Sequence, residues 1–215
     1  MGKNTTKNFE NTNMNRLDIW QAINKLDRLV FTTREIAQVT ESSLSSTTQR
    51  LVRLEEKKIV KKIVKGVWAL IYDKRFSPFM IIPFLSPSHQ SYVSFISALH
   101  LYGIISQIPQ TITIASTAHS KKITTPIGTY IIHQLEPSFF VGFNWHESGH
   151  FLIATPEKAL VDCVYISTRK KNVYSSFPEL EFPKSFSKKE VVKYIGLIKD
   201  KNSRHAVRKK METIL

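Results

Sequence analysis

The sequence predicts an α+β protein: a helical amino-terminal module that closes with a β-hairpin, then a mixed α/β domain that ends in a helix pair. Three observations predict this fold class. Apolar residues recur at helical spacing over residues 17–58, two β-rich segments flank Lys65 and Gly66, and strand-like and helix-like stretches alternate over residues 91–215. A hydrophobic fraction of 42% in 215 residues excludes a disordered chain and is sufficient for one large domain or two small ones.

The amino-terminal end has the composition of a tail. Residues 1–15 include five Asn and three Thr and lack the apolar centre of a secretory signal, so we predict that they are disordered. The longest wholly apolar stretch, Phe79–Leu85, is far shorter than the ~18 residues that a membrane span requires. The one cysteine, Cys163, has no partner for an internal disulfide. These features predict a cytoplasmic protein without a membrane segment.

Two short helices follow this tail. At about 100° per residue, a helix that starts at Leu17 is predicted to be amphipathic, with an apolar side formed by Ile19, Ala22, Ile23, Leu26 and Val30. Thr32 with Glu35 three positions later has the spacing of a capping box, in which the hydroxyl and the carboxylate satisfy backbone amides. This pair predicts the start of the second helix.

A third helix is predicted to start after Ser42 or Ser43 and to run to about Lys58. Its predicted inner face consists of Leu44, Leu51, Leu54 and the stem of Glu55. Its opposite face carries Ser45, Ser46, Gln49 and Arg53, with Arg50 at the flank. A helix that enters the major groove needs small residues for close approach and forked donors that pair with base edges. We therefore interpret this face as a DNA-reading surface.

A β-hairpin closes the module. Two β-rich segments are separated by Lys65 and Gly66, and glycine can adopt the positive φ that a tight turn requires. The lysines that are expected to contact phosphates are Lys61, Lys62 and Lys65, although broken alternation leaves their facing open. Three helices and a hairpin over residues 16–72 predict a winged helix-turn-helix domain. A small helical bundle with ordinary solvated Lys and Arg remains an alternative, as does a winged helix that binds protein.

The positive charge lies at the two ends of the chain. The net charge is +14 with a pI of about 9.9. Residues 1–72 carry +6 and residues 166–215 carry +8, whereas the centre is neutral. Clustered Lys and Arg favour double-stranded DNA or another polyanion as the partner, because neutralising phosphates releases condensed counterions. The alternative is a highly charged surface that only keeps the protein soluble.

The rest of the chain is predicted to hold a connector and a second domain. Residues 73–90 contain three prolines and little periodicity, which predicts a packed connector. Residues 91–215 are predicted as an α+β domain. Its expected elements are a helix over 91–103, strands over 111–117 and 128–135, a hairpin around 147–149, a helix after Thr155 and a closing helix pair that begins at Ser187.

The closing helix pair is strongly basic on its outer faces. The residues concerned are Lys188, Lys189, Lys193, Arg204, Arg208 and Lys209. Two interpretations stay open for them: a second polyanion-binding surface, and a charged face that is simply solvated.

No catalytic, cofactor-binding or metal-binding pattern is present in the sequence. The histidines of the central region are His133, His146 and His150. Their spacing matches no recognised metal site, and the chain has no HExxH pair and no glycine-rich phosphate loop. Cys163 is expected to be a buried, inert thiol. Glu157 and Asp162 diverge by about 140° on one predicted helix and so form no carboxylate pair. We expect a protein that is not an enzyme.

Several motifs resemble one protein family. The first is a helix that ends in Ala98, Leu99 and His100, followed by Gly103, Gln107 and Pro109. The later ones are Thr155–Leu160 with Asp162, and Tyr194, Ala206 and Val207 in the closing helices. With the winged helix ahead of these motifs, the sequence is similar to the AbiEi family, the antitoxins of type IV toxin–antitoxin systems. It departs from the family in its ending, METIL, and in a central loop that holds only Lys121 and Lys122.

The resemblance implies a transcriptional autorepressor. The amino-terminal module would bind operator repeats, and the carboxyl-terminal domain would counteract a nucleotidyltransferase-like toxin, without direct contact with that toxin being implied. Two other functions stay open from the residues alone. One is a nucleic-acid enzyme of nuclease type guided by the winged helix, and the other is a protein-interaction module built on the same fold.

Overall fold

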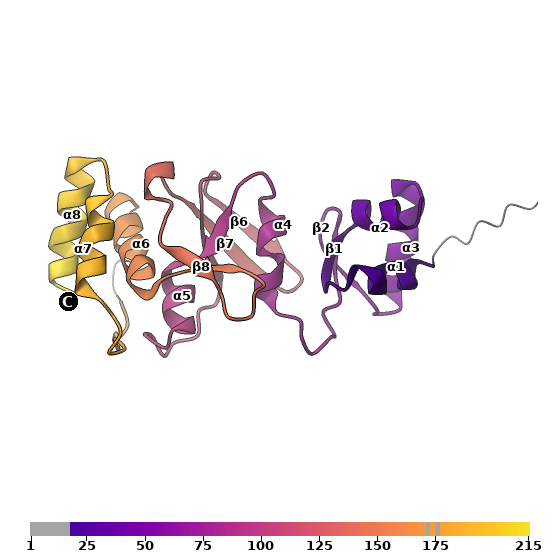
Figure 1. Cartoon of the computed structure of the whole chain (residues 1–215), viewed down its shortest axis with the longest axis horizontal. Coiled ribbons are helices and arrows are strands. Elements are labelled where there is room, and N and C mark those ends of the chain that lie inside the picture. Colours follow the sequence, from indigo (N-terminus) through magenta and orange to yellow (C-terminus); the bar gives the residue numbers. More distant parts are fainter. Residues whose placement is uncertain (1–17, 171–172, 175–176) are drawn as a thin grey trace, which may run out of the picture. The chain divides into compact units, whose positions relative to one another are not determined.

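The structure is a computed structural model that describes residues 18–170, 173–174 and 177–215, and it divides into two units at Arg75 and Phe76 (Figure 1). The tail predicted for residues 1–15 and the predicted helix start at Leu17 lie outside the described residues. In the described part of the chain, no helix combines the length and apolarity needed to cross a membrane. The architecture is α+β in the predicted order, a winged helix followed by a mixed α/β domain with a closing helix pair.

The first unit contains three helices and a three-stranded antiparallel sheet. Its elements are α1 (Ile19–Leu26), β1 (Val30–Thr32), α2 (Thr33–Val39), α3 (Leu44–Glu56), β2 (Lys61–Val64) and β3 (Val67–Ala69). The strand order is β1-β3-β2, so the hairpin strand β3 lies between β1 and β2. The prediction that Val30 belongs to the first helix is wrong, because α1 ends at Leu26 and Val30 begins β1. The reason is tertiary: β1 pairs with β3 from Val30 opposite Ala69 to Thr32 opposite Val67.

Side-chain caps fix the helix starts of this unit. The capping box predicted from Thr32 and Glu35 is confirmed, since the Thr32 side chain accepts from the Glu35 amide and Glu35 accepts from the Thr32 amide. Ser43 caps α3, because its hydroxyl accepts a 3.2 Å hydrogen bond from the Ser46 amide. Asp18 and Gln21 form a further capping box at α1. Each cap satisfies amides that the first turn of a helix leaves unpaired, which stabilises the helix by about 1 kcal/mol.

An apolar cluster holds the three helices on the sheet. Its buried members are Ile19, Ala22, Ile23, Phe31, Ile36, Leu51, Val60 and Trp68. The Trp68 ring is completely buried, and its Nε1–H donates a 2.9 Å hydrogen bond to Oγ1 of Thr33. Trp68 thereby joins β3 to the start of α2. Burial of a large apolar side chain of this kind stabilises a domain by about 1.5–3 kcal/mol.

The second unit is built on a six-stranded mixed sheet with the order β6-β7-β5-β4-β9-β8. Its strands are β4 (Ser91–Val93), β5 (Ile112–Ser116), β6 (Lys121–Thr125), β7 (Gly128–Gln134), β8 (Phe143–Trp145) and β9 (Leu152–Ala154). The pairs β5–β7 and β4–β9 are parallel, and the other pairs are antiparallel. Its helices are the 3-10 turns η1 (Pro78–Ile81) and η2 (Pro137–Phe139), and α4 (Ile82–Leu85), α5 (Phe95–Leu101), α6 (Pro156–Arg169), α7 (Lys188–Gly196) and α8 (Lys201–Glu212).

One predicted element is wrong in its first residues. The segment 91–103 was predicted as a single helix, but Ser91–Val93 form strand β4 and the helix α5 starts only at Phe95. The reason is tertiary, because β4 hydrogen-bonds to both β5 and β9 in the middle of the sheet, where Tyr92 and Val93 are completely buried. Local periodicity cannot anticipate partners that come from residues 112–116 and 152–154.

Helix α6 is central to the second unit. Its residues from Glu157 to Ile166 are all buried, so it is enclosed on every side. Helices α7 and α8 lie side by side and pack against α6 (Figure 1). Thr155 caps α6 and Pro156 occupies its first turn, as the sequence predicted. The charged outer faces of α7 and α8 are therefore presented on the side away from this core.

Candidate nucleic-acid interface

Helix α3 presents a line of polar side chains to solvent. Ser45, Gln49 and Arg53 are four residues apart, so they follow one another along the same face, and all three are exposed. Ser46 is exposed beside them. Thr47 and Leu51 are buried on the opposite side and hold the helix on the core. The structure thus brings four of the predicted DNA-reading residues together on one accessible surface, which we call the α3 crest.

The prediction that Leu44 lies on the buried face of α3 is wrong. Its side chain is 51% exposed, although it has nearly the same helical phase as buried Leu51. The difference is position along the helix, since Leu44 is in the first turn, which extends past the core cluster. Leu44 instead lines a groove between α3 and the hairpin.

Arg50 lies at the flank of α3 and is directed toward α1. Its guanidinium donates a 3.1 Å hydrogen bond to the Asp18 carboxylate at the start of α1. The same carboxylate caps α1. Because its guanidinium is held by Asp18, Arg50 joins α3 to α1 and is not part of the α3 crest.

The hairpin β2–β3 forms the wing and turns at Lys65 and Gly66. Gly66 has a φ of 76°, a left-handed conformation that glycine adopts without strain. Lys65 at the tip and Lys62 on β2 are both exposed. The Lys62 ammonium lies 5.8 Å from the centre of the Trp68 ring on the neighbouring strand. Both lysines are therefore accessible to a phosphate.

A β-bulge explains why the alternation of β2 did not predict its faces. Lys62 pairs with Trp68, but Val64 pairs with Val67, so the register shifts between them. Ile63, the residue between the two pairs, is the one residue of β2 whose side chain is buried. A bulge adds one residue to one strand and thereby breaks the period of two.

Glu55 of α3 anchors the base of the wing. Its Oε1 accepts a 3.1 Å hydrogen bond from the Lys62 backbone amide and lies 3.1 Å from Nζ of Lys61. Burial raises the pKa of Glu55, but these hydrogen bonds and the lysine charges outweigh it and leave the pKa below its ordinary value. Lys61 is thus engaged within the domain, in contrast to Lys62 and Lys65.

A groove runs between the start of α2, the first turns of α3 and the wing. Its lining includes Thr33, Arg34, Leu44, Thr48, Lys62 and Lys65. Arg34 is exposed on α2, and Thr48 is half-buried on α3. The sequence analysis did not single out these two residues, because the spacing along α2 and α3 does not show which helical face adjoins the wing. Cations from α2 and the wing meet here beside the α3 crest.

This arrangement can perform two kinds of recognition. The α3 crest combines small hydroxyl side chains with an amide and a guanidinium, the groups that pair with base edges in the major groove. Arg34, Lys62 and Lys65 supply positive charges at the side, where they would contact the phosphate backbone and fix the register of the helix.

The basic residues predicted on the closing helices are spread over α7 and α8. Lys188, Lys189 and Lys193 lie on α7, with Lys193 paired to Glu190 at 3.0 Å. On α8, Arg208 and Lys209 are exposed. Arg204 is half-buried, and its guanidinium donates a 3.2 Å hydrogen bond to the Ile198 carbonyl. Lys188 is exposed, but its ammonium donates a hydrogen bond to the Leu215 oxygen. Three of the six cations are thus exposed and have no ion-pair partner among the described residues: Lys189, Arg208 and Lys209.

The chemically reactive residues of the second unit have separate structural partners. His133 is buried and bonds to Tyr174, whereas His146 stacks on Phe151. Among the residues that the structure describes, no three His, Cys, Asp or Glu side chains gather as metal ligands. Cys163 is buried, as predicted, and burial raises the pKa of its thiol well above the ordinary value.

The two acidic residues of α6 also serve different parts of the fold. Glu157 accepts a 2.9 Å hydrogen bond from the Ser187 amide ahead of α7. Asp162 is completely buried and accepts a 2.7 Å hydrogen bond from the Ser94 hydroxyl. Each carboxylate is therefore committed to holding a helix in place.

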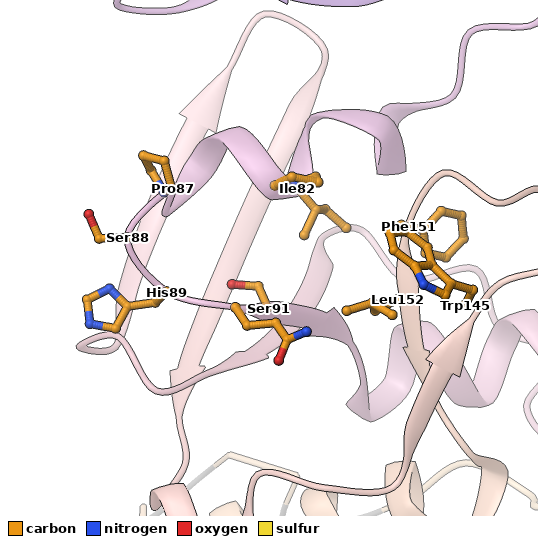
Figure 2. Close-up of a pocket in the computed structure, with 10 residues that line it drawn as sticks. Ile82, Pro87, Ser88, His89, Ser91, Trp145, Phe151 and Leu152 are labelled. Carbon is orange, nitrogen blue, oxygen red and sulfur yellow. The ribbon is translucent and has the colours of Figure 1, made fainter.

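A pocket of the second unit lies beside β4, β8 and β9. Trp145 and Phe151 line one end of it, and Ser88 and His89 lie at the other (Figure 2). The Trp145 side chain is 65% exposed, and the hydroxyl of Ser91 is buried without a partner among the described residues. Among the described residues that line this pocket, the one titratable side chain is His89.

Comparison with protein-family models gives one finding for the first unit. Residues 13–76 match a model described as Firmicute plasmid replication protein (RepL). A comparison with curated proteins gives no match. The matched residues include all of α1 to β3, together with the α3 crest and the wing. The fold of this unit and its family match agree that it is a winged-helix DNA-binding domain.

Proposed function

We propose that this protein is a sequence-specific transcriptional regulator that represses its own operon and acts as the antitoxin of a type IV toxin–antitoxin system. The observation that carries the DNA-binding part is the exposed α3 crest beside the basic wing. The antitoxin part is supported by the similarity of residues 98–109, 155–162 and the closing helices to the AbiEi family.

The geometry indicates how each residue would act on DNA. Ser45 and Ser46 allow close approach of the leading turn of α3 to the floor of the major groove. Gln49 and Arg53 follow at intervals of one turn, with the amide suited to adenine and the guanidinium to guanine. Lys62 and Lys65 contact phosphates from the wing, and Arg34 does so from α2. Lys61 and Arg50 support the wing and α1 while adding positive charge.

The proposed activity is binding without catalysis. The acids of α6 are held by structural hydrogen bonds, His133 bonds to Tyr174, and His146 stacks on Phe151. These contacts indicate that the carboxylates and imidazoles hold the fold together. In a nuclease, such groups would instead converge on a phosphate and a metal ion.

The experiment that tests DNA recognition uses the full-length protein and the region upstream of its own gene. We expect a footprint over repeated sequences at physiological salt, with affinity at least about a thousandfold above that for random duplex. Equal retardation of the upstream region and random DNA would contradict sequence-specific regulation. Metal-dependent cleavage of the DNA would instead favour the nuclease alternative.

The antitoxin part is tested by co-expression with a nucleotidyltransferase-like reading frame adjacent to the gene. We expect the protein to restore growth that this reading frame inhibits. Arg53→Ala should weaken repression but retain neutralisation, because the proposal assigns neutralisation to the carboxyl-terminal domain. Absence of such a reading frame, or no rescue of growth, would leave a regulator without an antitoxin role.

A second candidate function is initiation of plasmid replication. The specific observation in its favour is the match of residues 13–76 to the Firmicute plasmid replication family model. The test is whether the gene with its flanking DNA maintains a plasmid that lacks another origin. Stable transformants would favour this function, and their absence would favour the regulator.

A further inference from the structure

A row of methyl-bearing side chains lies beside the α3 crest. Leu44, Thr48 and Val52 are four residues apart, so they follow one another along α3 with an offset of about 40° per step. We call them the methyl row. Leu44 is 51% exposed, Val52 is 38% exposed and Thr48 is half-buried. Each of the three comes directly before a residue of the α3 crest in the sequence, so the two rows run side by side.

The methyl row lies on the side of α3 that adjoins the wing. Leu44 and Thr48 line the groove beside the wing together with Lys62 and Lys65. Glu55, which accepts a hydrogen bond from the Lys62 amide at the base of the wing, falls between Leu44 and Thr48 in helical phase. The methyl row therefore lies between the polar groups of the α3 crest and the cations of the wing.

Thr48 has no hydroxyl proton to offer to a ligand in this groove. Its Oγ1 donates a 2.7 Å hydrogen bond to the Leu44 carbonyl, one turn earlier in the same helix. A hydroxyl group has a single proton to donate, so this bond uses it, while the methyl group of Thr48 takes part in no hydrogen bond. Leu44 and Val52 have no polar side-chain atom. The row can therefore donate no side-chain proton to a base, and apolar contact is its main means of recognition.

The chemistry of the major groove contains one group that suits such a row. Single exposed apolar residues are common on protein surfaces, so exposure alone identifies no ligand. These three side chains, however, form a line on the helix that carries the base-reading groups. Among the groups that base pairs display in the major groove, the C5-methyl group of thymine is the apolar one.

The surroundings of the row favour a duplex over a protein partner. A stable protein interface covers about 800 Å² on each partner, far more than three side chains. A partner that packed on the methyl row would therefore also cover the crest and the cations Arg34, Lys62 and Lys65, and would have to compensate their loss of water. A duplex uses all three kinds of group at once, because it displays methyl groups, base edges and phosphates side by side.

We propose that the methyl row reads thymine, with Leu44, Thr48 and Val52 packed on C5-methyl groups of the operator while the α3 crest pairs with neighbouring base edges. Leu44 and Val52 are about 12 Å apart along the helix axis, several times the spacing of base pairs, so they contact thymines of different base pairs. This inference rests on the proposed DNA-binding function and adds to it the base that this side of α3 recognises.

The test replaces thymine by deoxyuridine in the duplex that the full-length protein protects upstream of its own gene. The two bases differ only in the C5-methyl group, so every hydrogen bond to the base is retained. Probes with single replacements, and one with all thymines replaced, are compared with the thymine duplex by competition binding at one salt concentration. We expect a loss of about three- to fivefold at each contacted position, the factor for one buried methyl group, and about tenfold or more for the fully replaced probe.

Variants of the protein connect each loss to a side chain. Leu44→Ala, Thr48→Ser and Val52→Ala should each weaken binding of the thymine duplex about three- to tenfold. Each should change binding less than twofold when the corresponding thymine is already replaced by uracil, because the methyl contact is then absent. Thermal unfolding identifies any variant that is destabilised, and the uracil probes test the wild-type protein without any substitution.

Two matched variants serve as controls. Thr48→Val keeps the methyl group and removes the hydroxyl, so it should retain the preference for thymine over uracil. Val192→Ala makes the same change as Val52→Ala at an exposed valine of α7, outside the winged helix. It should change the affinity for either duplex less than twofold.

Four results would contradict the proposal, and they separate it from the proposed function. Equal affinity for the thymine and uracil duplexes, with both bound far more tightly than random DNA, would overturn thymine reading and leave sequence-specific binding intact. Equal losses on both duplexes in the three row variants would assign the row to support of α3. Unchanged affinity of all three variants for both duplexes would place the row outside the DNA interface, as expected of a protein-binding surface. Binding of the upstream region no tighter than random DNA would overturn the proposed function itself, and thymine reading with it.

Discussion

Lys158 of α6 is completely buried, yet its ammonium group has partners on several sides. It forms an ion pair with Asp162 one turn later, donates a 3.1 Å hydrogen bond to Oη of Tyr92 and lies 3.8 Å from the centre of the Phe139 ring. Burial lowers the pKa of Lys158 and raises the pKa of Asp162, while the charge of each partner opposes that effect in the other. The pair joins α6 to β4 through Tyr92, to the start of α5 through Ser94 and to η2 through the Phe139 ring.

Removing one member of this pair should be far more harmful than removing both. Asp162→Ala leaves a buried ammonium group without its counter-charge, so we expect a loss of about 3–5 kcal/mol in the free energy of unfolding. Lys158→Met combined with Asp162→Leu leaves no charge in the core and should recover most of that loss. Urea unfolding of the two variants measures both values, and equal destabilisation would contradict the ion-pair explanation.

His133 predicts how stability depends on pH. Burial, with a smaller contribution from the charge of Lys170, lowers the pKa of His133 to about 4. The folded protein therefore binds fewer protons than the unfolded chain as the pH falls below the ordinary histidine value. Stability should decrease from about pH 6.5 downward and level off near pH 4, with a total loss of about 3 kcal/mol from this residue.

The measurement is the free energy of unfolding at pH 7.5 and pH 4.5 for wild type and His133→Gln. The glutamine retains a group that can bond to Tyr174 but does not titrate. The decrease between the two pH values should be about 2 kcal/mol smaller in the variant than in the wild type. The matched control is His205→Gln, an exposed residue of α8, which should leave the decrease unchanged.

Arg53 distinguishes base reading from charge attraction. It is exposed at the carboxyl-terminal end of the α3 crest, one turn after Gln49. Arg53→Ala should cost about 1–3 kcal/mol on the cognate site and much less on random duplex, because it removes a base contact. Competition binding at one salt concentration gives both values. Equal losses on the two duplexes would show that Arg53 contacts only phosphate.

The wing depends on contacts made by several elements. Glu55 of α3 holds the Lys61–Lys62 backbone, Trp68 joins β3 to α2, and β1 completes the sheet. These contacts fix the hairpin beside the first turns of α3. Lys62 and Lys65 are therefore held at a fixed position relative to the α3 crest. When they contact phosphates, they fix how α3 is oriented on the duplex while it contacts the bases.

Removing the two exposed wing lysines should weaken all duplexes alike. Lys62→Ala with Lys65→Ala removes about two phosphate contacts, so the slope of log affinity against log salt should become less steep by about 2. Lys25→Ala is a suitable control, because Lys25 is an exposed lysine of α1 away from the groove. A loss confined to the cognate site would instead assign these lysines to base reading.

At the scale of elements, local signals predicted most helices, and tertiary contacts decided the exceptions. The Thr32–Glu35 capping box and the Thr155–Pro156 start of α6 could both be predicted from the sequence, because a cap depends on residues within one turn. The strand β4 was not, because its partners are distant in sequence. The burial of Leu44 was predicted wrongly for a related reason. Periodicity shows which face of a helix is apolar, but not how far along the helix the core packs against that face.

The whole molecule consists of two units, each with its own core. The core cluster of the first unit draws all its members from residues 19–68. A fragment of residues 1–75 should therefore fold cooperatively and bind DNA. For about 60 ordered residues we expect a stability of roughly 3–9 kcal/mol.

Trp68→Ala in the same fragment is the informative variant. Loss of this buried ring should cost about 3–5 kcal/mol, enough to unfold a domain of marginal stability. Circular dichroism during thermal unfolding, followed by gel retardation, measures fold and DNA binding together. A fragment that unfolds without cooperativity while the full chain stays folded would show that the first unit depends on the rest of the chain.

The sequence by itself determined the fold class, the winged-helix module and the distribution of charge, because amphipathic periodicity, caps and turn glycines act over a few residues. It also indicated the polar line of α3. Only the tertiary structure decided which cations remain available, since Arg50 and Lys61 are paired with carboxylates of other elements while Lys62 and Lys65 are exposed. It alone revealed the groove beside the wing, because a groove arises where separate elements meet and no local pattern records that meeting.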